Sequence, residues 1–255
     1  MDAALKRIAI ITILLVGLVV NLAKGQVYNL KSFKGDDIQI KLLLDKGILS
    51  IRFLKDTVCF RNVDNLKIMK VLNNNFLMIV YDARAGSGMH MVRTLILSAN
   101  NNKICQSLNV TSFFKDEFLD FSKPHLTSPI EVEVKTVYNA DLSLTGNNNQ
   151  NYKLNGKVHG ERKSVHEPKI NYNYNDAASL HFDRNQNIFY NSHESIAQYF
   201  TIFDPKTQKE IKQYIKGTFP IAKLGRYKYY YIKNEWYERY DNDLSKYSFV
   251  GAPLP

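Results

Sequence analysis

The segment from Arg226 to Lys233 interleaves cations with tyrosines, and Trp236 and Arg239 follow closely. Aromatic rings stack on sugars or bases and cations attract anionic groups, so this combination suits an anionic polymer or a glycan. The candidate ligand-binding residues are Arg226, Lys228, Tyr229, Tyr231, Trp236 and Arg239. A packing role explains the same residues, because tyrosine favours strands and packs its ring across neighbours while its hydroxyl stays in water.

Side chains with the chemistry for catalysis or metal binding lack the spacing that such sites need. Ser87 lies between two glycines and three residues before His90, but the segment does not fit the G-x-S-x-G pattern of a nucleophile elbow. His159 and His166 have neither the i, i+4 nor the H-x-H spacing that presents two imidazoles to one metal. The sequence therefore predicts no catalytic residue, no metal ligand and no cofactor, and it favours a protein that is not an enzyme.

Two covalent modifications of exported proteins have candidate residues. Cys59 and Cys105 lie in strand-like stretches and form one disulfide if neighbouring strands bring their α-carbons within about 7 Å. Separate thiols that behave as small buried hydrophobic residues are the alternative, and the sequence leaves both open. Asn109-Val110-Thr111 fits the motif of a glycosylation acceptor, which matters only in a eukaryotic secreted protein.

The N-terminus has the layout of an export signal. Two cations precede an apolar run from Ile8 to Val20, and small residues, Ala23 and Gly25, stand before Gln26. Such a run spans only about 20 Å as a helix, whereas a stable transmembrane helix crosses about 30 Å of hydrocarbon. We expect residues 1–25 to be a cleaved signal peptide, with an uncleaved anchor or a buried core helix as the alternatives.

The chain is basic, with a formal net charge of +10 over 255 residues. Cleavage before Gln26 removes three cations and one anion, which leaves +8 on the mature protein. A basic surface favours anionic neighbours, although it also serves simply to keep a protein soluble. The expected location is secreted, periplasmic or elsewhere in the cell envelope. The expected partner is an anionic envelope polymer or glycan, or another envelope protein. We expect no specific binding of nucleic acid. We expect membrane contact only if the N-terminal segment stays uncleaved.

Alternation of apolar and polar residues is the dominant pattern after Gln26. Ile38–Leu44 and Ile130–Lys135 alternate with period two, and turns rich in Asn and Gly separate such segments. Phe76–Val110 predicts at least three consecutive antiparallel strands. The fold class is therefore mainly β, as an antiparallel β-sandwich or a curved multi-sheet assembly with one or two short helices.

Helical and linker signals are weak. Phe113–Leu119 and Lys206–Ile215 are the two segments with helix-like spacing. Residues 122–129 contain two prolines and mark a seam, either within a single domain of residues 26–255 or as a linker between two.

The tyrosine-rich C-terminal third predicts two hairpins. The first folds Ile202 and Phe203 back on Ile211 through residues 204–207, where Pro205 fixes φ for a tight turn. The second pairs Tyr227–Ile232 with Trp236–Tyr240.

Taken together, these patterns predict an exported, non-catalytic binding or structural module. One alternative is a secreted hydrolase whose site is assembled from residues distant in sequence. Another is a scaffold or assembly partner whose exposed strand edge pairs with a second chain.

Overall fold

The computed structural model describes residues 25–86, 88–100, 103–119, 132–146, 151–165, 167–204, 209–240 and 247–249. This part of the chain forms three antiparallel sheets, and every hydrogen-bonded pair of neighbours joins strands that are consecutive in sequence. The prediction of a mainly β, multi-sheet fold is confirmed. The signal-peptide segment up to residue 24 and the seam at 122–129 lie outside the described residues.

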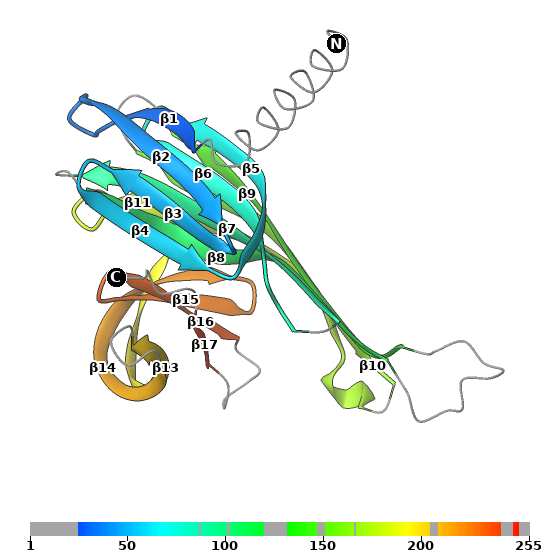
Figure 1. The fold of residues 1–255 in the computed structure, drawn as a ribbon. Coiled ribbons are helices and arrows are strands. Elements are labelled where there is room, and N and C mark those ends of the chain that lie inside the picture. The colour runs from blue at the N-terminus through cyan, green and yellow to red at the C-terminus, as the bar shows by residue number, and fades with distance from the viewer. Residues whose placement is uncertain are drawn as a thin grey trace, which may run out of the picture.

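The first sheet is a four-stranded meander that covers one face of the second (Figure 1). Its strands are β1(Gln26–Lys31), β2(Asp37–Asp45), β3(Ile48–Phe53) and β4(Asp56–Arg61). Alternate side chains, among them Ile40, Leu42 and Leu49, form one hydrophobic core with Ile79 and Leu95 of the second sheet. Period-two burial along β2 confirms the strand that the sequence predicts there.

The second sheet has eight strands in chain order and is strongly curled. They are β5(Val63–Leu72), β6(Phe76–Ala83), β7(Met89–Asn100), β8(Lys103–Leu119), β9(Val132–Thr145), β10(Lys153–Ser164), β11(Tyr172–Asp183) and β12(Ile188–Tyr190). Contact between β12 and β8 shows that the two halves of the sheet approach each other around a central core that includes Phe76, Leu108 and Phe189. Parts of β8, β9 and β10 run past this body as a long arm, which ends near the 3-10 helix η1(Pro168–Ile170) (Figure 1).

The third sheet closes around a small core of its own. Its strands are β13(Ser192–Asp204), β14(Lys209–Leu224), β15(Tyr227–Ile232), β16(Glu235–Tyr240) and β17(Tyr247–Phe249). Because β13 contacts β17, the sheet curls and encloses Ile196, Phe200, Ile215 and Tyr230. The sheet meets the second sheet where β14 contacts β11 and β12, and where β16 contacts β8.

Both predicted hairpins are present. Ile202 is the register partner of Ile211 in β13–β14, and Tyr231 is the partner of Trp236 in β15–β16. The β15–β16 turn contains two residues, Lys233 and Asn234, whose φ values are 51° and 67°. Two positive φ angles match a tight hairpin turn with the twist of its strands.

The two segments with helix-like spacing are strands. Phe113 and Phe114 belong to β8, and the described part of Lys206–Ile215 belongs to β14. Phe114 packs against the central core, whereas Phe113 lies on the other face with its ring centroid 5.3 Å from that of His90. Apolar neighbours on both faces of one strand produced the misleading spacing, and the described residues contain no α-helix.

The candidate modification sites are core or near-core residues. Cys59 and Cys105 are separate free thiols, and both are half-buried. Burial, followed by the nearby Asp56 carboxylate, raises the pKa of the Cys105 thiol. Asn109 is fully buried and accepts a hydrogen bond from Arg93 Nε at 3.2 Å, so the folded protein does not offer it to a glycosylating enzyme.

Two glycines make room for the tyrosine that joins the second and third sheets. A Cβ added to Gly160 in β10 overlaps the Tyr174 ring, and a Cβ on Gly225 lies 2.8 Å from Tyr174 Cε2. We expect Gly160→Ala to lower the free energy of unfolding by about 1–3 kcal/mol, because the ring must shift in a packed joint. Urea denaturation measures this loss.

Gly86→Ala is the matched control for this substitution. A Cβ at Gly86 meets only the Met89 side chain, at 3.5 Å, so its effect is expected to stay within about 0.5 kcal/mol. Equal stability of the Gly160→Ala and Gly86→Ala proteins contradicts the tight packing of Tyr174 against β10.

Candidate functional site

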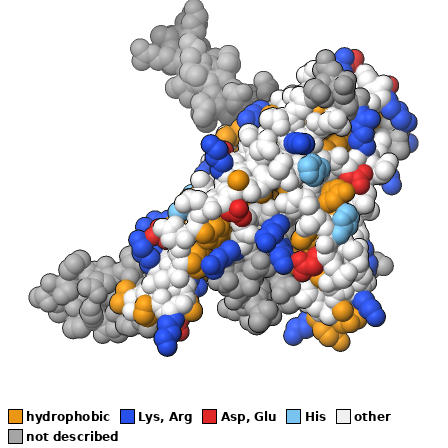
Figure 2. All heavy atoms as spheres, turned by 180° about the vertical axis from the view of Figure 1, so that it is seen from behind, with side chains coloured by type: hydrophobic (Ala, Val, Ile, Leu, Met, Phe, Trp, Pro, Cys, Tyr) orange, Lys and Arg blue, Asp and Glu red, His pale blue; other side chains and the backbone are white. Residues whose placement is uncertain are grey.

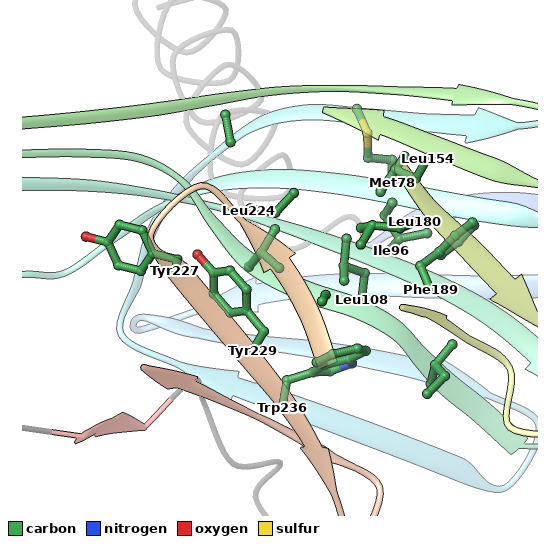
Figure 3. Close-up of a cluster of buried hydrophobic side chains, with 14 of the residues drawn as sticks. Met78, Ile96, Leu108, Leu154, Leu180, Phe189, Leu224, Tyr227, Tyr229 and Trp236 are labelled. Atoms are coloured by element: carbon green, nitrogen blue, oxygen red, sulfur yellow. The ribbon is translucent and has the colours of Figure 1, made fainter. Parts of the chain in front are cut away.

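The β15–β16 hairpin, which carries most of the predicted ligand-binding residues, is a wall between two hydrophobic cores. Tyr229 and Trp236 face the central core and are 0 % exposed (Figure 3). Tyr230 and Ile232 lie on the opposite face, in the core of the third sheet, and are also buried. Both faces of this hairpin therefore pack against a core. Tyr227 and Tyr229 of its tyrosine row are buried, and Tyr231 is half-buried.

The polar atoms of these two buried rings bind the second sheet. Trp236 Nε1 donates to the Gln106 carbonyl oxygen at 2.9 Å, and the Tyr229 hydroxyl donates to the Thr111 carbonyl oxygen at 3.3 Å. Burial raises the pKa of the Tyr229 phenol well above its ordinary value. The structure thus gives Tyr229 and Trp236 a packing role, since neither ring has a face available to a ligand.

The structure does not bring the other predicted residues onto one surface. Lys228 Nζ lies 3.0 Å from Glu194 Oε2, whereas the half-buried Tyr231 donates to Asn234 Oδ1 at 3.4 Å. Burial, and then the nearby Cys105, raises the pKa of Tyr231 to about 12. Arg226 stacks on tyrosines of β11 at the other end of the strand. The side chain of Arg239 lies outside the described residues, and its backbone pairs with that of Lys228.

An exposed aromatic and basic surface lies instead on the outer face of β13–β14. Tyr199 and Tyr214 are cross-strand partners, 60 % and 51 % exposed, with ring centroids 5.2 Å apart and ring planes at 62°. Lys212 and Lys216 flank Tyr214 two residues away on either side, and both are exposed. We call the outward-facing described residues the tyrosine–lysine face: Ser195, Ala197, Tyr199, Lys212, Tyr214, Lys216 and Thr218.

Strand alternation explains why these side chains point outward. In β13 the intervening residues Ile196 and Phe200 face the core of the third sheet, as does Ile215 in β14. The outer row of β14 continues to Ala222 and Leu224, which are buried in the central core. The same row is therefore exposed near the free end of the hairpin and buried where β14 lies beside the second sheet.

The chemistry of the tyrosine–lysine face is that of a stacking platform with cations. A sugar ring stacks on a tyrosine, while a lysine ammonium donates hydrogen bonds to an anionic substituent. Ser195 and Thr218 lie four residues along their strands from the two tyrosines, with their hydroxyl oxygens 2.8 Å apart, and both are exposed. Hydrophobic side chains gather between lysine or arginine side chains at this end of the molecule (Figure 2).

His90 belongs to a surface ion cluster. Its Nε2 lies 3.0 Å from Asp82 Oδ1, which is also 2.7 Å from Lys67 Nζ. Burial alone would raise the pKa of Asp82. The hydrogen bonds and charges of Lys67 and His90 together outweigh burial, so the pKa of Asp82 is lowered. Ser87 lies outside the described residues, and no group of metal-binding side chains was found among those that the structure describes.

A cavity of about 430 Å³ lies at one end of the first sheet. It is lined by the β1–β2 turn, the β3–β4 turn and the end of β7, including Phe33, Asp36, Leu54 and Asn100. Neither His90 nor the tyrosine–lysine face contributes to its wall.

Comparisons with protein-family models, with curated proteins and with solved structures found no match. Within the described ranges, no helix is long and apolar enough to cross a membrane.

Proposed function

We propose that this protein is exported and acts as a non-catalytic binding module, which holds an acidic polysaccharide of the cell envelope on the tyrosine–lysine face. The observation that carries the proposal is the exposed ring pair Tyr199–Tyr214 between Lys212 and Lys216. The signal-like N-terminus and the charge of +8 on the mature chain support an anionic ligand outside the cytoplasm.

The hairpin supports this role because it presents the rings on a fixed backbone. Register pairs run without a break from Ser192 and Ile221 to Asp204 and Lys209, so the strands hold both tyrosines in place. A site on paired strands loses less conformational entropy on binding than a site on a loop. A base stacked on an aromatic side chain is worth about 1–3 kcal/mol in nucleic-acid complexes, and we take the same order of magnitude for a sugar ring on each tyrosine. The lysines add an electrostatic attraction that salt weakens.

One outer strand of the second sheet, β5, is poorly suited to pairing with another chain, which counts against a scaffold that uses this edge. The outer strand β5 carries two register shifts, between Val63 and Asn65 and between Leu66 and Ile68. Bulges and lysines on an edge strand, here Lys67, hinder the addition of a further strand.

Calorimetric titration of residues 26–255 with polygalacturonate tests the proposal. We expect the double variant Tyr199→Ala/Tyr214→Ala to remain folded and to bind about 10–100 times more weakly, since two stacking surfaces are removed. Ile68→Ala is the control for loss of an exposed apolar side chain, because Ile68 is 48 % exposed on β5.

Two double lysine variants test how much the positive charge of the tyrosine–lysine face contributes to polymer binding. Lys212→Gln/Lys216→Gln and Lys41→Gln/Lys46→Gln remove the same charge, and all four lysines are exposed. Only the first pair is expected to weaken binding strongly. Undiminished binding by the double tyrosine variant, or equal losses in the two lysine pairs, contradicts recognition on this face.

A further inference from the structure

A second group of cations and aromatic rings lies where the arm of the second sheet meets the third sheet. Asp116, Thr136, Arg162 and Tyr172 are successive register partners across β8, β9, β10 and β11. Direct partners in an antiparallel sheet place their side chains on the same face, with Cβ atoms about 4.5–5.5 Å apart. The Arg162 side chain therefore emerges directly beside the Tyr172 ring.

A second arginine reaches the same ring from the β14–β15 turn. The guanidinium carbon of Arg226 lies 4.1 Å from the Tyr172 ring centroid and 5.3 Å from that of Tyr174. The Tyr174 hydroxyl accepts a hydrogen bond from the Arg226 backbone N–H at 3.3 Å. Stacking holds the guanidinium plane against the rings and leaves its N–H groups at the edge of the plane.

Two guanidinium groups, those of Arg162 and Arg226, thus lie near Tyr172. No carboxylate among the described residues pairs with both of them. Within the described residues neither Arg162 nor Arg226 forms an ion pair, and Arg162 Nε is shielded from water without a hydrogen-bond partner. Asp116 interacts electrostatically with Arg162, but burial raises the pKa of that carboxyl and so opposes its charge. Within the described residues Asp116 therefore offsets the charge of Arg162 only in part, and no carboxylate forms an ion pair with Arg226.

We infer that Arg162, Tyr172 and Arg226 form an oxyanion site that takes a carboxylate or phosphate group. Guanidinium groups bind such planar or tetrahedral oxyanions through two parallel N–H donors, which a lysine does not reproduce. The inference extends the proposed function, because an acidic polymer that lies on the tyrosine–lysine face supplies such groups. Binding of a free anion is nevertheless measured without the polymer.

Titration of residues 26–255 with inorganic phosphate and, separately, with galacturonate tests this site. NMR of the arginine Nε–H groups reports direct contact, and we expect the Arg162 and Arg226 signals to shift saturably with at least one anion. The anion that binds identifies the source, as a phosphate-bearing or a uronate-bearing ligand. Absence of a saturable shift with both anions overturns the inference.

Variants distinguish specific anion binding at this site from non-specific attraction by positive charge and from binding at the proposed polymer site. Arg226→Gln and Arg226→Lys are both expected to weaken anion binding about tenfold or more, because both lose the paired donors. Arg52→Gln removes the same charge as Arg226→Gln from an exposed position and is expected to leave anion binding unchanged.

The tyrosine variant makes the two failures distinguishable. Tyr199→Ala/Tyr214→Ala is expected to retain anion binding even though it loses the polymer. Equal losses in Arg226→Gln and Arg52→Gln, or full binding by Arg226→Lys, overturn the oxyanion site and leave the polymer proposal standing. If the Arg226 variants fail to fold, the arginine signals of the unmodified protein still decide the question.

Discussion

Replacement of Trp236 by alanine lowers the free energy of unfolding by about 3–5 kcal/mol, the cost of a large cavity in a packed core. Trp236 is fully buried between the second and third sheets, and its indole N–H satisfies the Gln106 carbonyl oxygen. Urea denaturation followed by far-ultraviolet circular dichroism measures the loss, because Trp236 is the only tryptophan in the chain and its fluorescence disappears with it.

The same variant separates packing from recognition. Tyr199→Ala is the control, since an exposed ring on β13 is expected to change stability by no more than about 0.5 kcal/mol. At low temperature, where Trp236→Ala stays largely folded, its polymer affinity is expected to match that of the unmodified protein. An unchanged unfolding midpoint for Trp236→Ala contradicts the buried position of the β15–β16 hairpin.

Truncation of Glu238 is expected to cost about as much, roughly 3–5 kcal/mol for Glu238→Ala, because it leaves a buried cation without its partner. Arg93 Nη1 lies 3.4 Å from Glu238 Oε2, and the exposed fractions of the two side chains are 9 % and 7 %. The Thr111 hydroxyl donates to the same carboxylate oxygen at 2.8 Å. This cluster joins β7 and β8 to β16 through polar contacts inside the protein.

The pH dependence of stability distinguishes Glu238→Gln from the unmodified protein. Burial raises the pKa of Glu238, and Arg93 and Thr111 lower it by less, so the pKa stays above the ordinary glutamate value. The native state therefore binds this proton more tightly than the unfolded state does. Its contribution to stability is fully present below the unfolded pKa and is lost as pH rises through the native pKa.

We consequently expect Glu238→Gln to gain stability relative to the unmodified protein as pH rises above about 4.3, the ordinary pKa of glutamate. The glutamine amide oxygen still accepts from Thr111 without bringing a charge into the core. Denaturation at a series of pH values measures the difference between the two proteins. A difference that is constant with pH, or that changes in the opposite direction, contradicts the raised pKa.

Local sequence patterns predicted many of the strands and two hairpins. Period-two alternation predicted strands such as β2, and the turn residues around Pro205 predicted the β13–β14 hairpin, although not its exact register. The structure fixes the register at Ile202–Ile211, and three residues further along the strands this register places Tyr199 opposite Tyr214. The alternation of Ile196 and Phe200 with Ala197 and Tyr199 also indicates which row faces outward.

The burial of the β15–β16 hairpin is not predictable from that segment alone. Alternation identifies a strand with one covered face, whereas Tyr229 and Tyr230 are neighbours that are both buried, on opposite faces. Tyr229 is buried against β8, where its hydroxyl donates a hydrogen bond to the carbonyl oxygen of Thr111, which lies 118 residues earlier in the chain. Contacts over such separations depend on how the second sheet curls, and its own sequence pattern does not specify that curvature.

The central claim is that recognition occurs on β13–β14 and not on β15–β16. The most direct measurement is the change in backbone amide chemical shifts of residues 26–255 when polygalacturonate is added. We predict that the largest changes cluster around Tyr199 and Tyr214 and disappear in the Tyr199→Ala/Tyr214→Ala variant. Largest changes within Tyr227–Tyr240, or changes that survive in that variant, would contradict the claim.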